Sequence, residues 1–297
     1  MPITLQLTGH AKDLGGGFLV RRVLPAAARQ SVGPFLFFDH FGPVTVPPGG
    51  GHAVRPHPHI GLATVTYLFD GAMLHSDSLG YVQQIAPGAI NWMTAGRGIV
   101  HSERPPPALA ASAYTNHGIQ LWAALPQAFE EVEPSFTHTP ADDIPELTVG
   151  DAQVRVLIGQ AWGQTSPVAT FAPTLYLDIT LPAGGLLDLP PLAQELAVYP
   201  VDADVNVDGV VLAARTLALL EPGQTTQIRA TAAGTATRLL VIGGDAPDGQ
   251  RFISWNFVSS RKERIVQAGA DWQAQRMGQV PGDAEFIPLP EKRSAHV

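Results

Sequence analysis

Cysteine is absent from the 297 residues of this chain. Its absence excludes disulfide bonds, thiolate metal ligands and cysteine nucleophiles, so any metal site must be built from histidine and carboxylate side chains. A chain without cysteine is also compatible with a reducing compartment, and we expect a cytoplasmic protein.

Two further absences narrow the expected partners. The sequence has no stretch of about 20 continuous apolar residues, and its first residues are not a basic region followed by an apolar run. We therefore expect neither a membrane span nor a secretory leader. The 18 Lys and Arg residues form no block that could follow a phosphate backbone, and the formal net charge is −8. Direct binding to nucleic acid is not expected, and small molecules or proteins fit better.

Glycine (30 residues) and proline (27 residues) are abundant, and they separate short β-rich runs along the whole chain. Such spacing is typical of sandwiches and barrels, so the predicted class is all-β. A first set of runs covers 34–38, 63–69, 81–85, 90–94 and 118–125. A second set, beyond a proline- and acid-rich passage, covers 154–158, 175–181, 196–199, 216–220 and 238–242.

The two sets of runs predict two β-domains, over residues 1–138 and 145–245, followed by a tail over 246–297 that packs back on them. Short echoes between the sets suggest a duplicated domain: 67–71 resembles 205–209, and 85–88 resembles 220–223.

One helix is expected in the tail. Ser260 and Glu263 fit a capping box at its start, and Ile265, Ala268 and Trp272 recur at helical spacing. Trp272 is expected to anchor this helix against a β-domain.

Histidine is concentrated in the first domain, where nine of the ten precede residue 140. His57 and His59 stand at the head of a β-branched run, and in a strand they would share one face about 7 Å apart. Pro58 between them is tolerated only at a sheet edge or bulge.

His101 and Glu103 form a second alternating pair, so two facing strands would offer three imidazoles and one carboxylate. This donor set suits Fe(II), Mn(II), Ni(II), Cu(II) or Zn(II), and with open positions it is closer to oxygen-activating non-haem iron than to structural zinc.

Each of these histidine motifs also has an interpretation that involves no metal. A His-x-His pair also occurs on exposed strands, and His101-Ser102-Glu103 could be a hydrogen-bonded surface pair. His75, in Leu74-His75-Ser76-Asp77-Ser78, is expected in a solvent-exposed loop because serine and aspartate crowd around it.

Several strings together resemble the pirin family of the cupin superfamily. They are His57-Pro58-His59, TVTYL at 64–68, WMTAGRGIVHSE at 92–103, HGIQLW at 117–122 and VPGD at 280–283. The resemblance implies a bicupin, in which two antiparallel β-barrels of the double-stranded β-helix or jelly-roll type lie face to face.

In such a protein the first barrel holds one metal ion, typically Fe(II), through residues that match His57, His59, His101 and Glu103, and the second barrel lacks ligands. General cupins take a carboxylate from the position of Ala63. Its loss here should leave the metal set intact and alter neighbouring hydrogen bonds.

Some pirins resemble quercetin 2,3-dioxygenases, so the resemblance implies a metal-dependent enzyme that opens a flavonol with O2, with Glu103 as the catalytic base. The alternative is a non-enzymatic, iron-binding redox regulator that acts through a protein partner; a structural zinc site is a third reading. Because duplicated barrels can bury their faces within one chain, we expect a monomer.

Overall fold

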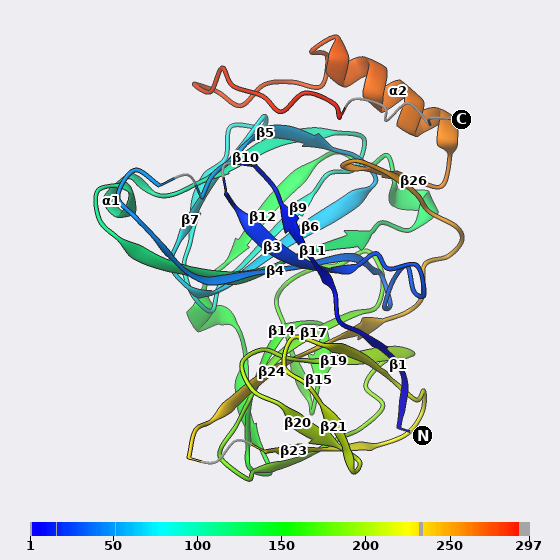
Figure 1. Ribbon diagram of the computed structural model, residues 1–297. Coiled ribbons are helices and arrows are strands. Elements are labelled where there is room, and N and C mark those ends of the chain that lie inside the picture. The colour runs from blue at the N-terminus through cyan, green and yellow to red at the C-terminus, as the bar shows by residue number, and fades with distance from the viewer. Residues whose placement is uncertain (1, 16, 51, 232–233, 291–297) are drawn as a thin grey trace, which may run out of the picture.

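The computed structural model describes residues 2–15, 17–50, 52–231 and 234–290. Within these ranges the chain folds into two β-sandwiches, one above the other in Figure 1, and the C-terminal segment lies across the outer side of the upper one. The predicted all-β class is confirmed.

The first sandwich consists of a seven-stranded and a four-stranded antiparallel sheet. The larger sheet has the order β12-β9-β6-β11-β4-β3-β2 and the smaller one the order β5-β10-β7-β8. The strand bounds are β2 His10–Asp13, β3 Leu19–Leu24, β4 Phe35–Val46, β5 Val54–His59, β6 Leu62–Asp70, β7 Met73–Asp77, β8 Val82–Ile85, β9 Ile90–Thr94, β10 Ile99–Arg104, β11 Tyr114–Ala124 and β12 Ser135–Thr139.

The second sandwich repeats this plan with the sheet orders β1-β22-β19-β24-β17-β14-β13 and β18-β23-β20-β21. Its bounds are β1 Ile3–Leu7, β13 Glu146–Val149, β14 Ala152–Ile158, β17 Thr174–Leu181, β18 Leu186–Leu189, β19 Glu195–Pro200, β20 Val205–Val207, β21 Val210–Leu212, β22 Leu217–Leu220, β23 Thr226–Ala230 and β24 Thr237–Gly244. Outside the sandwich sheets lie β15 Gln160–Ala161, β16 Gln164–Thr165, β25 Phe252–Ser254, β26 Phe257–Ser259, helices α1 Pro107–Ala110 and α2 Lys262–Gln273, and 3-10 turns η1 Gln127–Phe129 and η2 Ala141–Asp143.

The strand orders show the duplication. The neighbours β9-β6-β11-β4 and β5-β10-β7-β8 correspond one by one to β22-β19-β24-β17 and β18-β23-β20-β21. The sequence echoes, however, are offset by one strand, because 67–71 contains the end of β6 whereas 205–209 contains β20, the counterpart of β7. Aspartate-glycine and proline-glycine turns recur for local reasons, so the repeat is in topology and these strings do not mark equivalent positions.

Sheet hydrogen bonds define the form of the two β-domains. Among the described strands, no ladder joins the two sheets of either sandwich, so the expected barrels have the open, jelly-roll form. In addition, β1 pairs with β22, so a strand from the range 1–138 completes the large sheet of the second sandwich. The exact domain limits remain a prediction.

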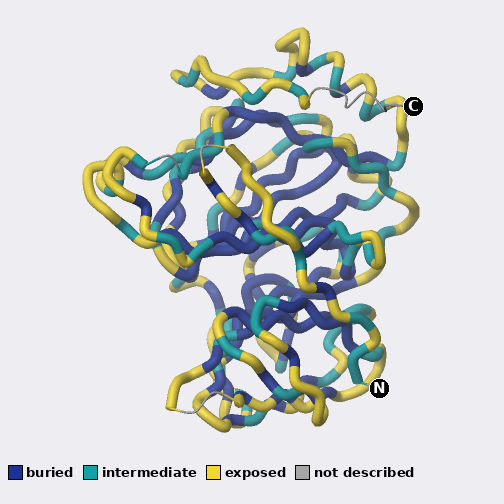
Figure 2. Tube along the Cα trace, in the orientation of Figure 1, coloured by how far each residue is buried: buried dark blue, intermediate teal, exposed yellow. Residues whose placement is uncertain are grey.

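A continuous apolar core joins the two sandwiches. Ala63, Val65 and Tyr67 on β6 share one buried cluster with Tyr176 and Leu240 of the second sandwich. Figure 2 shows the buried trace running through the junction. Strand β6 is covered on both faces, because every one of its residues except the last is buried.

Several polar side chains in this junction are hydrogen-bonded to each other. The Tyr67 hydroxyl donates a hydrogen bond to Asp178 Oδ2 at 2.6 Å. The His40 ring lies 2.8 Å from both Tyr199 Oη and His117 Nε2. Burial lowers the pKa of His40 to about 3, so its ring is neutral at physiological pH. The second sandwich thus supports the first by packing and hydrogen bonding.

The tail packs on the first sandwich, and its helix does not begin with the predicted capping box. Helix α2 spans Lys262–Gln273 with Arg261 as the N-cap residue, and no side-chain capping bond forms. The predicted capping box is therefore wrong, because the Ser260 hydroxyl and amide instead donate hydrogen bonds to the buried carboxylate of Glu130. In the described part of the chain, no helix has the length and apolar character needed to cross a membrane.

Trp272 is the anchor that its spacing predicted. Its side chain is 2% exposed, it packs in a cluster with Ile60, Val100 and Phe257, and its Nε1 donates to the carbonyl of Ile287 at 2.9 Å. The substitution Trp272→Ala is expected to lower the free energy of unfolding by about 3–5 kcal/mol, because it leaves a cavity. Urea unfolding measures this loss, and Val266→Ala on the solvent face of the same helix is the control. Equal effects of the two changes would contradict the anchoring role.

Candidate metal centre

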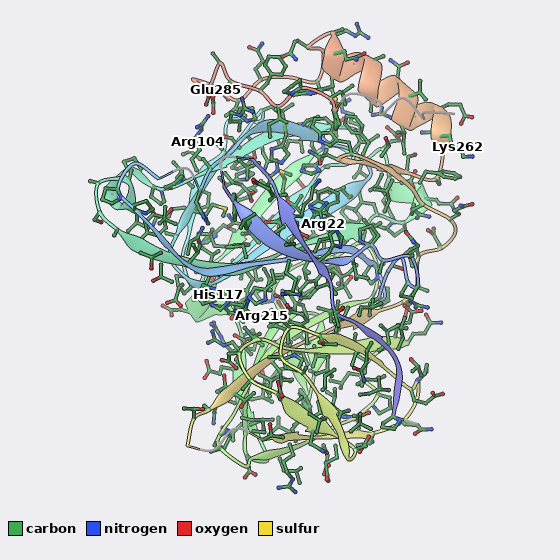
Figure 3. The ribbon with its side chains drawn as sticks, in the orientation of Figure 1. Arg22, Arg104, His117, Arg215, Lys262 and Glu285 are labelled. Atoms are coloured by element: carbon green, nitrogen blue, oxygen red, sulfur yellow. The ribbon has the colours of Figure 1, made fainter. Side chains whose placement is uncertain are left out.

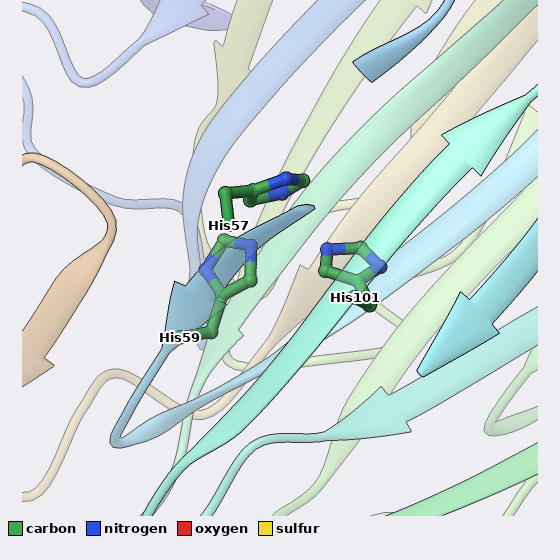
Figure 4. A group of neighbouring side chains, drawn as sticks. All are labelled: His57, His59 and His101. Carbon is green, nitrogen blue, oxygen red and sulfur yellow. The ribbon is translucent and has the colours of Figure 1, made fainter. Parts of the chain in front are cut away.

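Strands β5 and β10 bring the three predicted histidines together. In the antiparallel pairing His101 lies opposite His57 and Ile99 lies opposite His59, so all three imidazoles share one face. One ring nitrogen from each lies within 4.8 Å of the others (Figure 4). Strand β5 is the edge of its sheet, which explains how Pro58 is accommodated.

Backbone carbonyls fix the ring orientation of two of these histidines. His57 Nδ1 lies 2.9 Å from the carbonyl of Arg55, and His59 Nδ1 lies 3.2 Å from the carbonyl of Asn256. A carbonyl only accepts hydrogen bonds, so Nδ1 carries the proton in each ring and Nε2 presents a lone pair. This arrangement is typical of metal-ligating histidines.

His101 supplies the third nitrogen. Its Nδ1 lies 3.4 Å from His75 Nδ1, whereas its buried Nε2 has no hydrogen-bond partner among the described residues. An unpaired buried nitrogen is costly unless a group outside the chain satisfies it. Three imidazoles around one point are a donor set that fits a divalent transition metal.

All three rings are in the protonation state that metal binding requires. Burial lowers the pKa of His57 to about 4 and lowers the pKa values of His59 and His101 well below 6.5, with like-charge repulsion between the rings adding to the effect. The rings are therefore neutral at pH 7 without a metal bound. A site of this kind binds cations without first losing protons.

The lowered pKa values predict a loss of stability in acid for the metal-free protein. The unfolded chain protonates His57 below about pH 6.5, whereas the folded chain does so only near 4, so the folded state loses stability as the pH falls through this window. Protonation of His57 alone should lower the free energy of unfolding by about 3 kcal/mol between pH 7 and pH 4.

Urea unfolding at several pH values, with a chelator present, tests this expectation. The His57→Gln variant should show a shallower decline in stability than the wild type. Parallel pH profiles for the two proteins would contradict the assignment of a buried neutral His57.

Glu103 lies in the same cavity but outside the tight group of three. The pairing of β5 with β10 shifts register between His101 and Glu103, which displaces Glu103 along the strand. Thr66 Oγ1 lies 3.4 Å from Glu103 Oε1 and 3.0 Å from Gln120 Oε1, so the two acceptors share one hydroxyl proton. Burial raises the pKa of Glu103 to about 7, and the Thr66 hydrogen bond opposes this rise.

A cavity of about 470 Å³ gives access to these residues. One wall is aromatic: the rings of Phe37 and Trp122 stack 3.9 Å apart, and the Arg22 guanidinium lies 4.3 Å from the Phe37 ring centre. Asp39 binds Arg22 through both of its oxygens at 2.9 and 2.7 Å, so the arginine charge is paired. The volume suits a small planar molecule.

The tail completes the mouth of this cavity. Trp255 and Ile287 line it, and the Ile287 amide donates to the carbonyl of Pro56 at 2.8 Å. Arg104, directly after Glu103, binds Asp283 at 2.7 Å and also binds Glu285; Figure 3 shows Arg104 and Glu285 together beside the tail.

Two sequence expectations about the surroundings of the site are corrected. His75 is 5% exposed and lies in strand β7, so the prediction of an exposed loop is wrong. Met73, His75 and Asp77 are buried while the residues between them are partly exposed, and this period of two in the sequence could have indicated a strand. Ala63 points into the core between the sandwiches, so a carboxylate there would not reach the cavity and its loss leaves the hydrogen bonds of the site unchanged.

Two family models and several known proteins match this chain. The family model "Pirin" matches residues 17–123, and the model "Pirin C-terminal cupin domain" matches residues 176–278. A pirin-like protein of Caulobacter vibrioides is 46% identical over 294 residues, which is 97% of this chain and 100% of that protein.

Two crystal structures of quercetin 2,3-dioxygenase from Acinetobacter baumannii are also similar. The first has a TM-score of 0.89 at 32% identity and covers 96% of this chain and 94% of its own. The second has a TM-score of 0.86 at 26% identity and covers 94% of this chain and 98% of its own. The duplicated sandwiches are thus a bicupin fold, and this chain belongs to the pirin family.

Proposed function

We propose that this chain is a metal-dependent dioxygenase that opens a flavonol such as quercetin with O2. The observation that carries the proposal is the convergence of three bare, buried imidazole nitrogens on one point of a cavity with an aromatic wall. The similarity to proteins that are described as quercetin 2,3-dioxygenases supports the choice of reaction.

His57, His59 and His101 would hold the ion, with Glu103 as a fourth, oxygen ligand. Fe(II) suits this mixed set, and Mn(II), Ni(II), Cu(II) and Zn(II) are chemically acceptable in the same positions. When bound, such an ion supplies Lewis-acid stabilisation of an enolate and the electronic means of reaction with O2.

In this proposal Glu103 accepts the substrate hydroxyl proton. Its carboxylate faces the cavity, and the pKa of about 7 in the metal-free chain is near the value at which a base works at neutral pH. Coordination to a cation would lower this pKa, so Glu103 acts as a base most readily when it is only weakly held.

The remaining cavity residues bind and orient the substrate. The stacked pair Phe37 and Trp122 offers an apolar wall to a planar ring system, and the tail residues Trp255 and Ile287 restrict the entry of water. Because the two sandwiches bury a shared core within one chain, we propose that the protein works as a monomer.

Oxygen consumption tests this function. Protein of known metal content, reconstituted with Fe(II), is expected to take up one O2 for each quercetin consumed, and no uptake is expected after chelation. Fully loaded protein that consumes no O2 with quercetin would contradict the proposal. It would then favour the regulator hypothesis, which predicts a partner affinity that differs between Fe(II) and Fe(III).

A further inference from the structure

A buried pair, His75 and Asp77, lies directly behind His101 and has no part in the proposed reaction. Strand β7 pairs with β10 so that Asp77 lies opposite His101. Asp77 is fully buried, and the His75 ring stacks on Phe136 with its centre 4.2 Å away and the planes 12° apart. Burial and stacking thus fix both side chains beside His101.

The hydrogen bonds of Asp77 determine which ring nitrogen of His75 carries its proton. Asp77 Oδ1 accepts from the amides of Leu79 at 2.9 Å and Tyr81 at 3.1 Å, which fixes the carboxylate, and Oδ2 lies 2.8 Å from His75 Nε2. A carboxylate only accepts, so the proton of His75 is on Nε2. With this proton on Nε2, the other ring nitrogen, Nδ1, presents a lone pair 3.4 Å from His101 Nδ1.

We propose that Asp77 and His75 are positioning residues that hold the proton of His101 on Nδ1 and so keep its Nε2 free for the metal. The inference rests on the proposed use of His101 as a ligand. Backbone carbonyls do the same for His57 and His59. For His101 the acceptor is a side-chain relay, the ring of His75, which is itself held by Asp77. A substitution in this pair can therefore move the His101 proton to the other ring nitrogen.

The substitution Asp77→Asn should reverse the relay without changing its shape. The two amide donors, Leu79 and Tyr81, still require an oxygen at Oδ1, so the new amide nitrogen must face His75 Nε2. Because that amide donates, the His75 proton moves to Nδ1 and is donated to His101 Nδ1. His101 then carries its proton on Nε2, where it opposes the binding of any cation.

Nitrogen-15 NMR of the imidazoles in the metal-free protein shows which ring nitrogen of His101 carries the proton. The wild type is expected to show His101 protonated at Nδ1, and Asp77→Asn to show it protonated at Nε2. Titration with Ni(II) alone should show a loss of affinity of about 10- to 100-fold for Asp77→Asn. The control Asp178→Asn changes another buried carboxylate, in the second sandwich, and should leave both the proton position and the Ni(II) affinity unchanged.

The double variant Asp77→Asn/His75→Phe separates the relay from a general structural effect. Phenylalanine keeps the stacking on Phe136 but cannot donate to His101, so Ni(II) affinity should recover several-fold relative to Asp77→Asn alone. If Asp77→Asn does not fold, His75→Phe alone should abolish the preference of His101 for the Nδ1 proton.

Three results would each overturn the inference. They are a wild-type His101 protonated at Nε2, a proton position that none of these variants changes, and a double variant weaker than Asp77→Asn. Because these readings use metal-free protein or Ni(II) alone, they do not depend on turnover. A protein that shows the switch but does not consume quercetin would contradict the proposed function and leave the relay standing.

Discussion

His101→Ala is expected to abolish quercetin-dependent oxygen uptake and to lower metal affinity by more than about 100-fold. Loss of a hydrogen-bond partner of a ligand typically costs 10- to 100-fold in affinity, so loss of the ligand itself should cost more. The substitution removes one of the three nitrogens that converge within 4.8 Å. Equilibrium dialysis followed by metal analysis measures the affinity, and an oxygen electrode measures the activity.

The control for this experiment is His138→Ala. His138 lies in β12, where its Nδ1 is paired with Asn91 Oδ1 at 2.7 Å, and it belongs to the same sandwich without lining the cavity. It should keep wild-type metal content and activity. Full metal binding by His101→Ala would contradict the three-histidine site.

The second large effect is expected from Glu103→Gln. Glutamine keeps an oxygen that can face the metal, but it does not accept a proton at neutral pH. The rate of quercetin oxidation should therefore fall by about 100- to 10,000-fold, the usual contribution of a positioned base. Initial rates of oxygen uptake are compared at equal metal content, so that a change in chemistry is not confused with a loss of metal.

Glu285→Gln is the matched control for that substitution. Glu285 lies on the tail and is bound to Arg104, next to Glu103 in the sequence, but its side chain is 55% exposed and outside the cavity. The Glu285→Gln variant should oxidise quercetin at the wild-type rate. A Glu103→Gln variant within about threefold of the wild-type rate at full metal content would contradict the base assignment.

Much of the fold could be predicted because strand periodicity and turn residues are local signals. The expected runs at 90–94 and 175–181 coincide with β9 and β17 to within one residue, and the inward face of β5 was correctly inferred from His57 and His59. Tertiary pairing is not local, so the sequence did not indicate that β1 crosses to the second sandwich.

The three histidines of the candidate metal centre were more predictable than their surroundings. His57, His59 and His101 follow from alternation on two strands, whereas the carbonyl of Asn256 reaches His59 from a hairpin 197 residues further along the chain. His75 was misassigned because serine and aspartate around it suggested a loop, although they alternate with buried residues in β7. The contact between Asn256 and His59 depends on the folded arrangement, so no local sequence pattern predicts it.

The most direct test of the proposed activity follows the atoms of O2. Quercetin is incubated with Fe(II)-loaded protein under ¹⁸O2, and the ring-opened product and released gas are analysed by mass spectrometry. If the chain is a quercetin 2,3-dioxygenase, one CO is released per quercetin consumed, and both labelled oxygen atoms are found in the ring-opened product. Metal-loaded protein that yields no CO, or a product with only one labelled atom, would contradict it.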